Sequence, residues 1–131
     1  MLRRVITTES APAAIGPYSQ GIAAGTLIFT AGQLGIDPES GQLVAGSVAA
    51  QTRQALRNLE AVLKAGDSGL DAVLKTTVFL TDMTDFQEMN DVYATVFTSA
   101  QPARSTVAVS ALPMNARVEI EAVAIAHPTA D

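Results

Sequence analysis

The strongest helical pattern in the chain lies between residues 47 and 64. Apolar side chains recur there every three or four positions, the spacing that places them on one face of an α-helix. Ser47 is a favoured N-cap residue, and Gly66 stands just after the pattern, where helices commonly end. A helix is therefore predicted over residues 47–64. Its buried stripe comprises Val48, Ala55, Leu56, Leu59, Val62 and Leu63.

A second amphipathic pattern begins at Thr84. Thr84 and Gln87 have the spacing of a capping box, in which two side chains satisfy the first unpaired N–H groups of a helix. We therefore expect a second helix that starts at Thr84. Its predicted buried face comprises Phe86, Met89, Tyr93, Val96 and Phe97.

Several shorter segments have the pattern of β-strands. Apolar or β-branched residues occur on both faces of the segment 73–81, which predicts a strand covered on both faces. The other predicted strands are the two arms of a hairpin over 21–32, with its turn at Gly25 and Thr26, and the segments 104–110 and 117–126. Turn-forming residues cluster at 37–41 and 112–115.

The order of these elements is strand, hairpin, helix, strand, helix, strand, strand. It predicts a single α+β domain over residues 1–131, with a mixed sheet and both helices packed on one face. The opposite face of the sheet then has no cover within the chain.

Composition narrows the function classes. The 131 residues include no cysteine, which excludes disulfides and thiolate metal sites. The net charge is −5 and no basic run is present, so a nucleic-acid partner is not expected. Only 16% of the residues are charged, which fits either an alanine-rich chain or a surface partly buried between subunits. No segment has the roughly 20 apolar residues of a membrane span, and we expect a cytoplasmic protein.

Alternation along the last two predicted strands suggests a polar face. The positions assigned to the core are apolar: Val107, Val109, Val118, Ile120, Ala122 and Ala124. Matching these apolar positions predicts that the intervening polar residues share the outer face of the sheet. They are Arg104, Thr106, Glu119 and Glu121. The same pattern also fits a solvated surface with a weak ion pair.

Other candidate sites carry little information on their own. His127 is the only histidine, which disfavours a Ser-His-Asp triad or a histidine metal site. The glycines at 32 and 35 lack the spacing and the lysine of a phosphate loop. Tyr18 follows a Gly-Pro turn, and Asn90 lies at the margin of the second apolar stripe.

Five ordered segments between Thr8 and Ala126 nevertheless form a recognisable set. They are APAAIGPYSQG (11–21), TAGQ (30–33), KTTVFL (75–80), PARST (102–106) and VEIEA (118–122). Together they resemble the reactive intermediate deaminase family (RidA/YjgF), also called L-PSP endoribonuclease or translation inhibitor. The resemblance implies a chorismate mutase-like α+β fold and a homotrimer with clefts between neighbouring subunits.

The resemblance also implies an activity without metal or cofactor. Deaminating members hydrolyse reactive enamines and 2-imino acids, such as 2-iminobutanoate and 2-iminopropanoate, to 2-oxo acids and ammonia. The arginine that corresponds to Arg104 holds the substrate carboxylate, and the glutamate that corresponds to Glu119 places the attacking water and moves protons. A free imine carbon is already electrophilic, so these two tasks suffice for hydrolysis.

Further pocket residues follow from the same resemblance. Tyr18 and Asn90 match substrate-pocket positions, and Gly32 matches a glycine whose backbone N–H approaches the substrate. Ala31 stands where the best-characterised deaminases have serine, and Thr106 where many members have cysteine. We expect these two departures to affect rate and substrate range.

Two other classes of function are compatible with the resemblance. One is a ribonuclease or translation inhibitor, although the acidic charge and the single histidine suit RNA cleavage poorly. The other is a non-catalytic metabolite-binding or chaperone-like trimer. Release of ammonia separates this binding protein from a deaminase.

Overall fold

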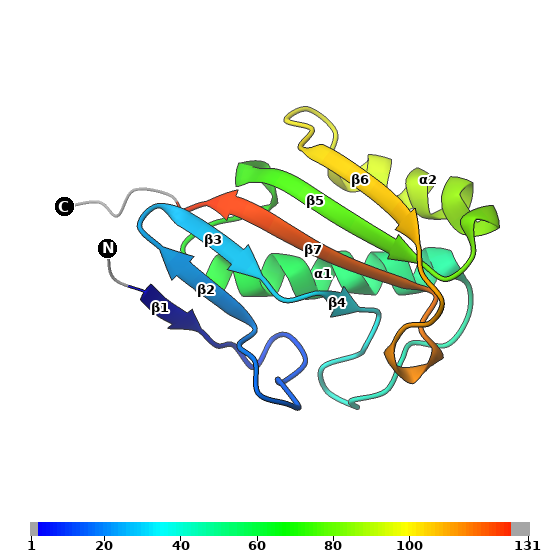
Figure 1. Ribbon diagram of the computed structural model, residues 1–131, viewed down its shortest axis with the longest axis horizontal. Helices are drawn as coiled ribbons and strands as arrows, with labels where there is room; N and C mark the ends of the chain where they lie inside the picture. The colour runs from blue at the N-terminus through cyan, green and yellow to red at the C-terminus, as the bar shows by residue number, and fades with distance from the viewer. Residues whose placement is uncertain (1–2, 127–131) are drawn as a thin grey trace.

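The computed structural model describes residues 3–126 and contains one mixed β-sheet with two helices behind it (Figure 1). The strand order is β1-β2-β3-β7-β5-β6, and a short strand β4 also pairs with β7. Among the strand pairs of the described residues, β5–β6 is parallel and the others are antiparallel. The strands are β1 (Arg3–Ile6), β2 (Gly21–Ala24), β3 (Leu27–Thr30), β4 (Gln33–Leu34), β5 (Val73–Leu80), β6 (Ala103–Ala108) and β7 (Val118–Ile125). The predicted α+β class, mixed sheet and placement of both helices on one face are confirmed.

Helix α1 (Val48–Ala65) agrees closely with the prediction. The Ser47 side chain accepts a hydrogen bond from the backbone N–H of Ala50, and the N–H of Gly66 donates to the carbonyl of Leu63. All six residues of the predicted stripe are buried. The stripe packs against β7 and β4, so α1 lies behind the centre of the sheet in Figure 1.

Helix α2 (Phe86–Val96) forms where expected, but it begins differently. Asp82 Oδ1 accepts hydrogen bonds from both the backbone N–H and the hydroxyl of Thr84, at 2.9 and 2.8 Å. Gln87 donates along the helix to Asp91. The predicted capping box is therefore wrong. Thr84 is hydrogen-bonded to Asp82 instead of Gln87, and this contact stabilises a 3-10 turn, η2 (Met83–Asp85), ahead of the helix.

The hairpin of β2 and β3 has the predicted turn. Gly25 adopts a φ of 61°, in the left-handed region that glycine enters at little cost. Strand β4 was not predicted, since two residues are too few to show alternation. The segments 37–41 and 112–115 turn as expected, the second through a 3-10 turn η3 (Pro113–Asn115).

The outer face of the sheet points to the viewer in Figure 1 and is covered by neither helix. The helix-facing residues of β5 are fully covered, whereas Lys75, Thr77 and Phe79 on the outer face are only half-buried. The prediction that β5 is covered on both faces therefore holds for one face of the isolated chain. Large apolar side chains exposed on this outer face include Val5, Leu27, Phe29, Val107 and Ile125.

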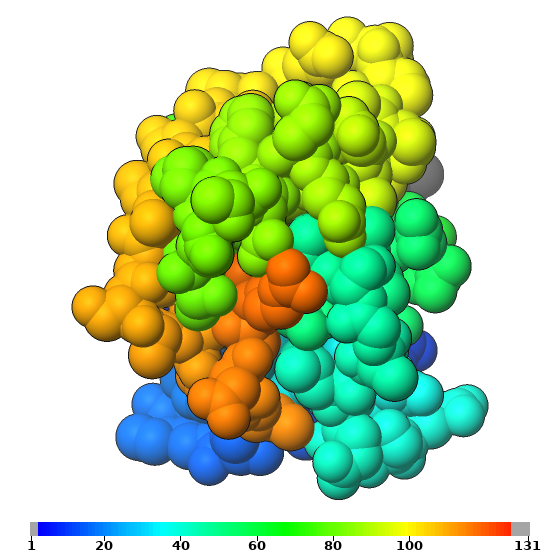
Figure 2. Space-filling model, turned by 90° about the vertical axis from the view of Figure 1, so that its right-hand side faces the viewer, coloured from blue at the N-terminus to red at the C-terminus, as the bar shows by residue number. Residues whose placement is uncertain are grey.

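One end of the sheet is closed by two segments that are distant in the sequence. Figure 2 shows the segment around 13–20 (blue) beneath the segment around 110–116 (orange). Both segments line one pocket with Glu119, described below. Within residues 3–126, no helix is long and apolar enough to cross a membrane.

Candidate functional site

Arg104 and Glu119 lie on opposite faces of the sheet. Arg104 is the cross-strand partner of Thr76, which is fully buried beneath α2. Glu119 is the partner of Phe79, three residues further along β5. Cross-strand partners point to the same side and residues an odd number apart point to opposite sides. The prediction that Arg104 and Glu119 share the outer face is therefore wrong.

The error has a physical cause in β6. This strand lies at the edge of the sheet, where neither face is deeply buried, so its apolar positions do not mark the core. Val107 points outward and is 41% exposed, whereas Arg104 and Thr106 face α2. Glu121 remains on the outer face with Glu119, as predicted.

Arg104 is held by one side of α2. Its Nη1 donates to Asn90 Oδ1 at 2.7 Å. Its Cζ lies 4.7 Å from the centre of the Tyr93 ring and 5.5 Å from that of Phe86, within cation–π range. No acidic side chain of residues 3–126 forms an ion pair with Arg104. Its capacity to bind a carboxylate through two parallel N–H donors is therefore unused within this part of the chain.

Thr106 lies two residues from Arg104 on the same face. Its Oγ1 is the single buried side-chain polar atom in the described part of the chain without a hydrogen-bond partner. An unpaired buried hydroxyl is unfavourable. The region around Arg104 thus contains, among residues 3–126, both a cation without an ion pair and an unsatisfied hydroxyl.

Glu119 lines a pocket of about 430 Å³ on the other side of the sheet. The walls are mostly apolar and include Ile15, Ile36 and Met114, and Tyr18 lies at the same pocket. Gly32 packs directly against the carboxyl group: a Cβ at this position would lie 2.5 Å from Glu119 Oε2. Only glycine leaves room here for the Glu119 carboxyl group, because a side chain at position 32 would overlap it.

The electrostatics of this pocket favour a proton on Glu119. Burial raises the pKa of the Glu119 carboxyl above its ordinary value, and the negative charge of Glu121 raises it further. A carboxyl group whose pKa moves toward neutrality can both accept and donate a proton during turnover. The direction of this pKa shift is the one that acid–base catalysis by a carboxyl group requires.

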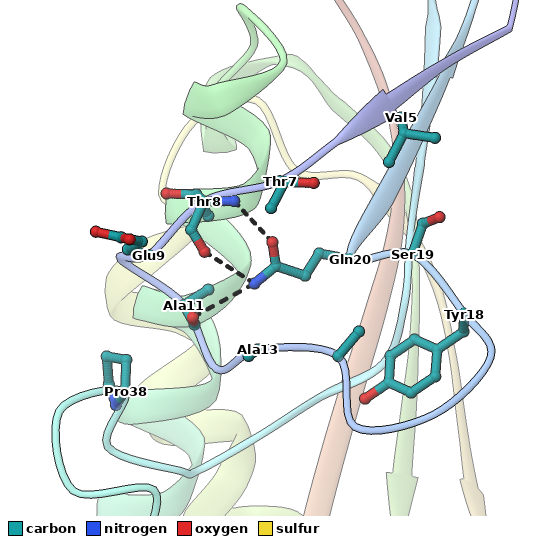
Figure 3. Close-up of a pocket in the computed structure, with 11 residues that line it drawn as sticks. Val5, Thr7, Thr8, Glu9, Ala11, Ala13, Tyr18, Ser19, Gln20 and Pro38 are labelled. Atoms are coloured by element: carbon teal, nitrogen blue, oxygen red, sulfur yellow. Dashed lines mark hydrogen bonds between the residues drawn. The ribbon is translucent and has the colours of Figure 1, made fainter.

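Gln20 fixes the loop that carries Tyr18, and sequence analysis missed it. Its Oε1 accepts from the Thr8 N–H at 2.7 Å, and its Nε2 donates to the carbonyls of Thr8 at 3.0 Å and Pro12 at 2.7 Å. Figure 3 shows the buried amide at the centre of this loop, with Tyr18 on the loop's far limb. The backbone carbonyl of Gln20 also accepts a hydrogen bond from the N–H of Ala31, the residue before Gly32. These contacts span 8 to 12 residues and have no periodic signature.

The predicted site residues thus form two separate groups in one chain. The group on the helix side contains Arg104, Asn90 and Thr106, and the group on the outer side contains Tyr18, Ala31, Gly32 and Glu119. The two residues with predicted catalytic roles, Arg104 and Glu119, therefore lie in different groups. Among residues 3–126, no three His, Asp or Glu side chains are close enough together to hold a metal ion. His127 lies outside the described residues.

Comparison with known proteins places this arrangement in a family. The model of the family described as Endoribonuclease L-PSP matches residues 8–126. The chain belongs to this family. The predicted RidA/YjgF relationship is thereby confirmed.

The L-PSP relatives are similar along their full length. The mouse protein named 2-iminobutanoate/2-iminopropanoate deaminase is 50% identical over 128 residues, which cover 98% of this chain and 95% of that one. The human protein of the same name is also 50% identical over 128 residues, covering 98% of this chain and 93% of its own. The names of these relatives agree with the predicted class of enzyme, which acts on C–N bonds.

Solved structures of L-PSP family proteins share the fold. The crystal structure of the YjgF gene product from E. coli matches with a TM-score of 0.90 at 45% identity, covering 93% of this chain and 98% of that one. The structure of E. coli TdcF with bound serine matches with a TM-score of 0.90 at 39% identity, covering 95% and 99%.

Proposed function

We propose that this chain is a hydrolytic deaminase that converts 2-iminobutanoate, 2-iminopropanoate and related enamines to 2-oxo acids and ammonia. The observation that carries the proposal is Glu119, a half-buried carboxyl with a raised pKa at the wall of an apolar pocket. Relatives with half of their residues in common are named for this reaction. The proposal includes the cytoplasmic location expected from the sequence, which cell fractionation would test.

The proposed active site is shared between neighbouring subunits of a homotrimer. The side chains of Arg104 and Glu119 project from opposite faces of the sheet, so a substrate bound to one chain could contact only one of the two required groups. The outer face carries exposed apolar side chains, including Phe29 and Val107, which a second copy of the chain would cover. Such packing would bring Glu119 of one subunit toward Arg104 of the next subunit, which lies at the edge of that subunit's sheet.

The proposed reaction needs three contributions from the protein. Arg104 binds the carboxylate through its planar pair of N–H donors and thereby orients the imine carbon. Glu119 accepts a proton from water as the oxygen attacks this carbon, forming a tetrahedral carbinolamine. The carboxyl returns this proton to the nitrogen; it then transfers the proton of the carbinolamine hydroxyl to the amine as the C–N bond breaks and the C=O bond forms, so that ammonia and the 2-oxo acid leave. One water is consumed and no electrons are transferred.

The deciding experiment generates the imine in the presence of the protein. An amino-acid oxidase or threonine dehydratase would supply 2-iminopropanoate or 2-iminobutanoate, with semicarbazide as a competing trap. We expect faster formation of ammonia and 2-oxo acid and a lower yield of semicarbazone. The matched control is Glu119→Gln, which keeps the size of the side chain but cannot carry the proton. Absence of acceleration by the wild-type protein on both imines would contradict the proposal.

The family description, Endoribonuclease L-PSP, gives a specific reason to test a second function, endoribonuclease activity. An RNA titration at two salt concentrations serves this purpose, because binding through phosphates weakens steeply with salt. With the acidic charge of −5 we expect weak, salt-insensitive binding and no cleavage. A protein that binds 2-oxo acids without releasing ammonia would instead support the metabolite-binding or chaperone-like trimer.

A further inference from the structure

A buried hydroxyl pair joins helix α2 to the sheet directly beside Arg104. The hydroxyls of Tyr93 and Thr76 lie 2.8 Å apart and share a hydrogen bond. Tyr93 is 7% exposed and Thr76 is fully buried, so water does not compete for this bond. Thr76 is also the cross-strand partner of Arg104. The bond therefore joins α2 to Thr76, the residue of β5 that pairs with Arg104 on β6.

The Tyr93 ring is constrained from three sides. Its hydroxyl is bound to Thr76, its ring contacts Phe97 at a centroid distance of 4.6 Å, and the guanidinium of Arg104 lies over it at 4.7 Å. A ring with a fixed hydroxyl cannot tilt freely about its side-chain torsions. Its orientation therefore sets the surface against which the guanidinium lies.

The neighbouring contact completes the support of the guanidinium. Asn90 Oδ1 accepts from Nη1 at 2.7 Å, which restricts the rotation of the planar group, while the Tyr93 ring lies 4.7 Å from Cζ. The remaining N–H donors are left for a carboxylate. A bidentate contact depends on the orientation of both groups, so a small tilt of the guanidinium weakens it.

We propose that Tyr93, through its hydroxyl bond to Thr76, is a positioning residue for Arg104 and sets its affinity for the substrate carboxylate. The inference rests on the proposed function, in which Arg104 binds that carboxylate. Tyr93 itself does not contact substrate. Burial raises the pKa of Tyr93, so its hydroxyl stays protonated throughout the neutral pH range. The support is therefore constant under assay conditions.

Three variants separate positioning from a merely structural role. Tyr93→Phe removes only the hydroxyl oxygen, and Thr76→Val replaces the partner hydroxyl with a methyl group. Each single change leaves one buried hydroxyl unpaired and lowers stability, whereas the double variant leaves none and recovers part of the loss. The ring remains unanchored in all three. We therefore expect stability to recover in the double variant while carboxylate binding does not.

Binding is measured with 2-oxobutanoate by calorimetry and with the imine by steady-state kinetics. We expect Kd and KM to rise about fivefold in all three variants, comparable to the net effect of one hydrogen bond, with kcat changed much less. The matched control is Thr52→Val, which removes another fully buried hydroxyl, bound within α1 to the Val48 carbonyl at 2.7 Å. This control should lose stability and keep wild-type Kd and KM.

A spectroscopic measurement separates this inference from the proposed function. The Nε–H signal of Arg104 in a ¹H–¹⁵N spectrum, assigned with Arg104→Lys, reports the position of the guanidinium over the aromatic rings. It should shift in Tyr93→Phe and remain in place in Thr52→Val. A shifted signal in a protein that releases no ammonia would support the positioning role and remove the deaminase proposal. An unchanged signal with unchanged Kd, or binding that recovers together with stability in the double variant, would overturn the inference.

Discussion

Arg104 on β6 and Glu119 on β7 project from opposite faces of one β-sheet, where they pair with Thr76 and Phe79 of β5, the strand between them. A small 2-imino acid cannot contact both groups through the thickness of the sheet. The proposed reaction therefore depends on assembly, because only a second copy of the chain can bring a base to the arginine.

The oligomeric state is the first prediction. Light scattering at micromolar concentration should give about three times the 13.6 kDa mass of the chain, since closed symmetric assembly can cover the exposed apolar side chains on the outer face of every copy. Phe29 and Val107 lie on this face, and replacing either with lysine should weaken the assembly and the activity together. A monomer with full activity would contradict the shared site.

Complementation between two inactive variants gives a sharper prediction. Arg104→Lys and Glu119→Gln each disable one half of the site, so each homotrimer should be inactive. Mixed trimers, refolded together from equal amounts, contain some clefts with both native residues. With random assembly about a quarter of the clefts are intact, so activity should return to roughly a quarter of the wild-type value. A site within one chain would give no recovery in the mixture.

The sequence predicted the helices and the central strands well for a physical reason. Helix α1 and strand β7 are buried along one full face, so their apolar spacing reports the core directly. Strand β6 is at an edge, and alternation there assigned Arg104 to the wrong face. Contacts such as those between Tyr93 and Thr76, or between Gln20 and Thr8, join residues far apart along the chain and leave no periodic signal. The site residues themselves came from the family motifs, which do not show how the two halves meet.

Arg104→Lys tests the carboxylate anchor. Lysine keeps the positive charge but loses the planar pair of donors and the bond to Asn90, so kcat/KM should fall by roughly 30-fold or more. Folding should be nearly unaffected, because Arg104 has no ion pair within residues 3–126. Kinetics and the thermal midpoint measured on the same preparation check both statements. Wild-type kcat/KM in this variant would exclude Arg104 as the anchor.

Gly32→Ala tests the packing of Glu119. The added Cβ would overlap the carboxyl group, at 2.5 Å from Oε2, and must displace it. The φ of Gly32 is not in the left-handed region, so the backbone tolerates alanine without strain. We expect activity to fall by at least about tenfold, as general acid–base catalysis is lost, while the 2-oxo acid remains bound through Arg104. Loss of binding and activity together would instead point to unfolding, which circular dichroism would reveal.

The pH dependence follows from the raised pKa of Glu119. Free enzyme needs the ionised carboxylate to deprotonate water, so the acid limb of kcat/KM should lie above 4.5, the ordinary value for glutamate. The negative charge of Glu121 contributes to the shift, and Glu121→Gln should move this limb to lower pH. Stability responds in the same range. Because the folded state binds the proton more tightly than the unfolded state, Glu119 lowers stability as pH rises above 4.5. Glu119→Gln should therefore unfold at higher temperature than wild type at neutral pH, with the difference vanishing below pH 4.5. An acid limb that is unchanged in Glu121→Gln would show that another group controls it.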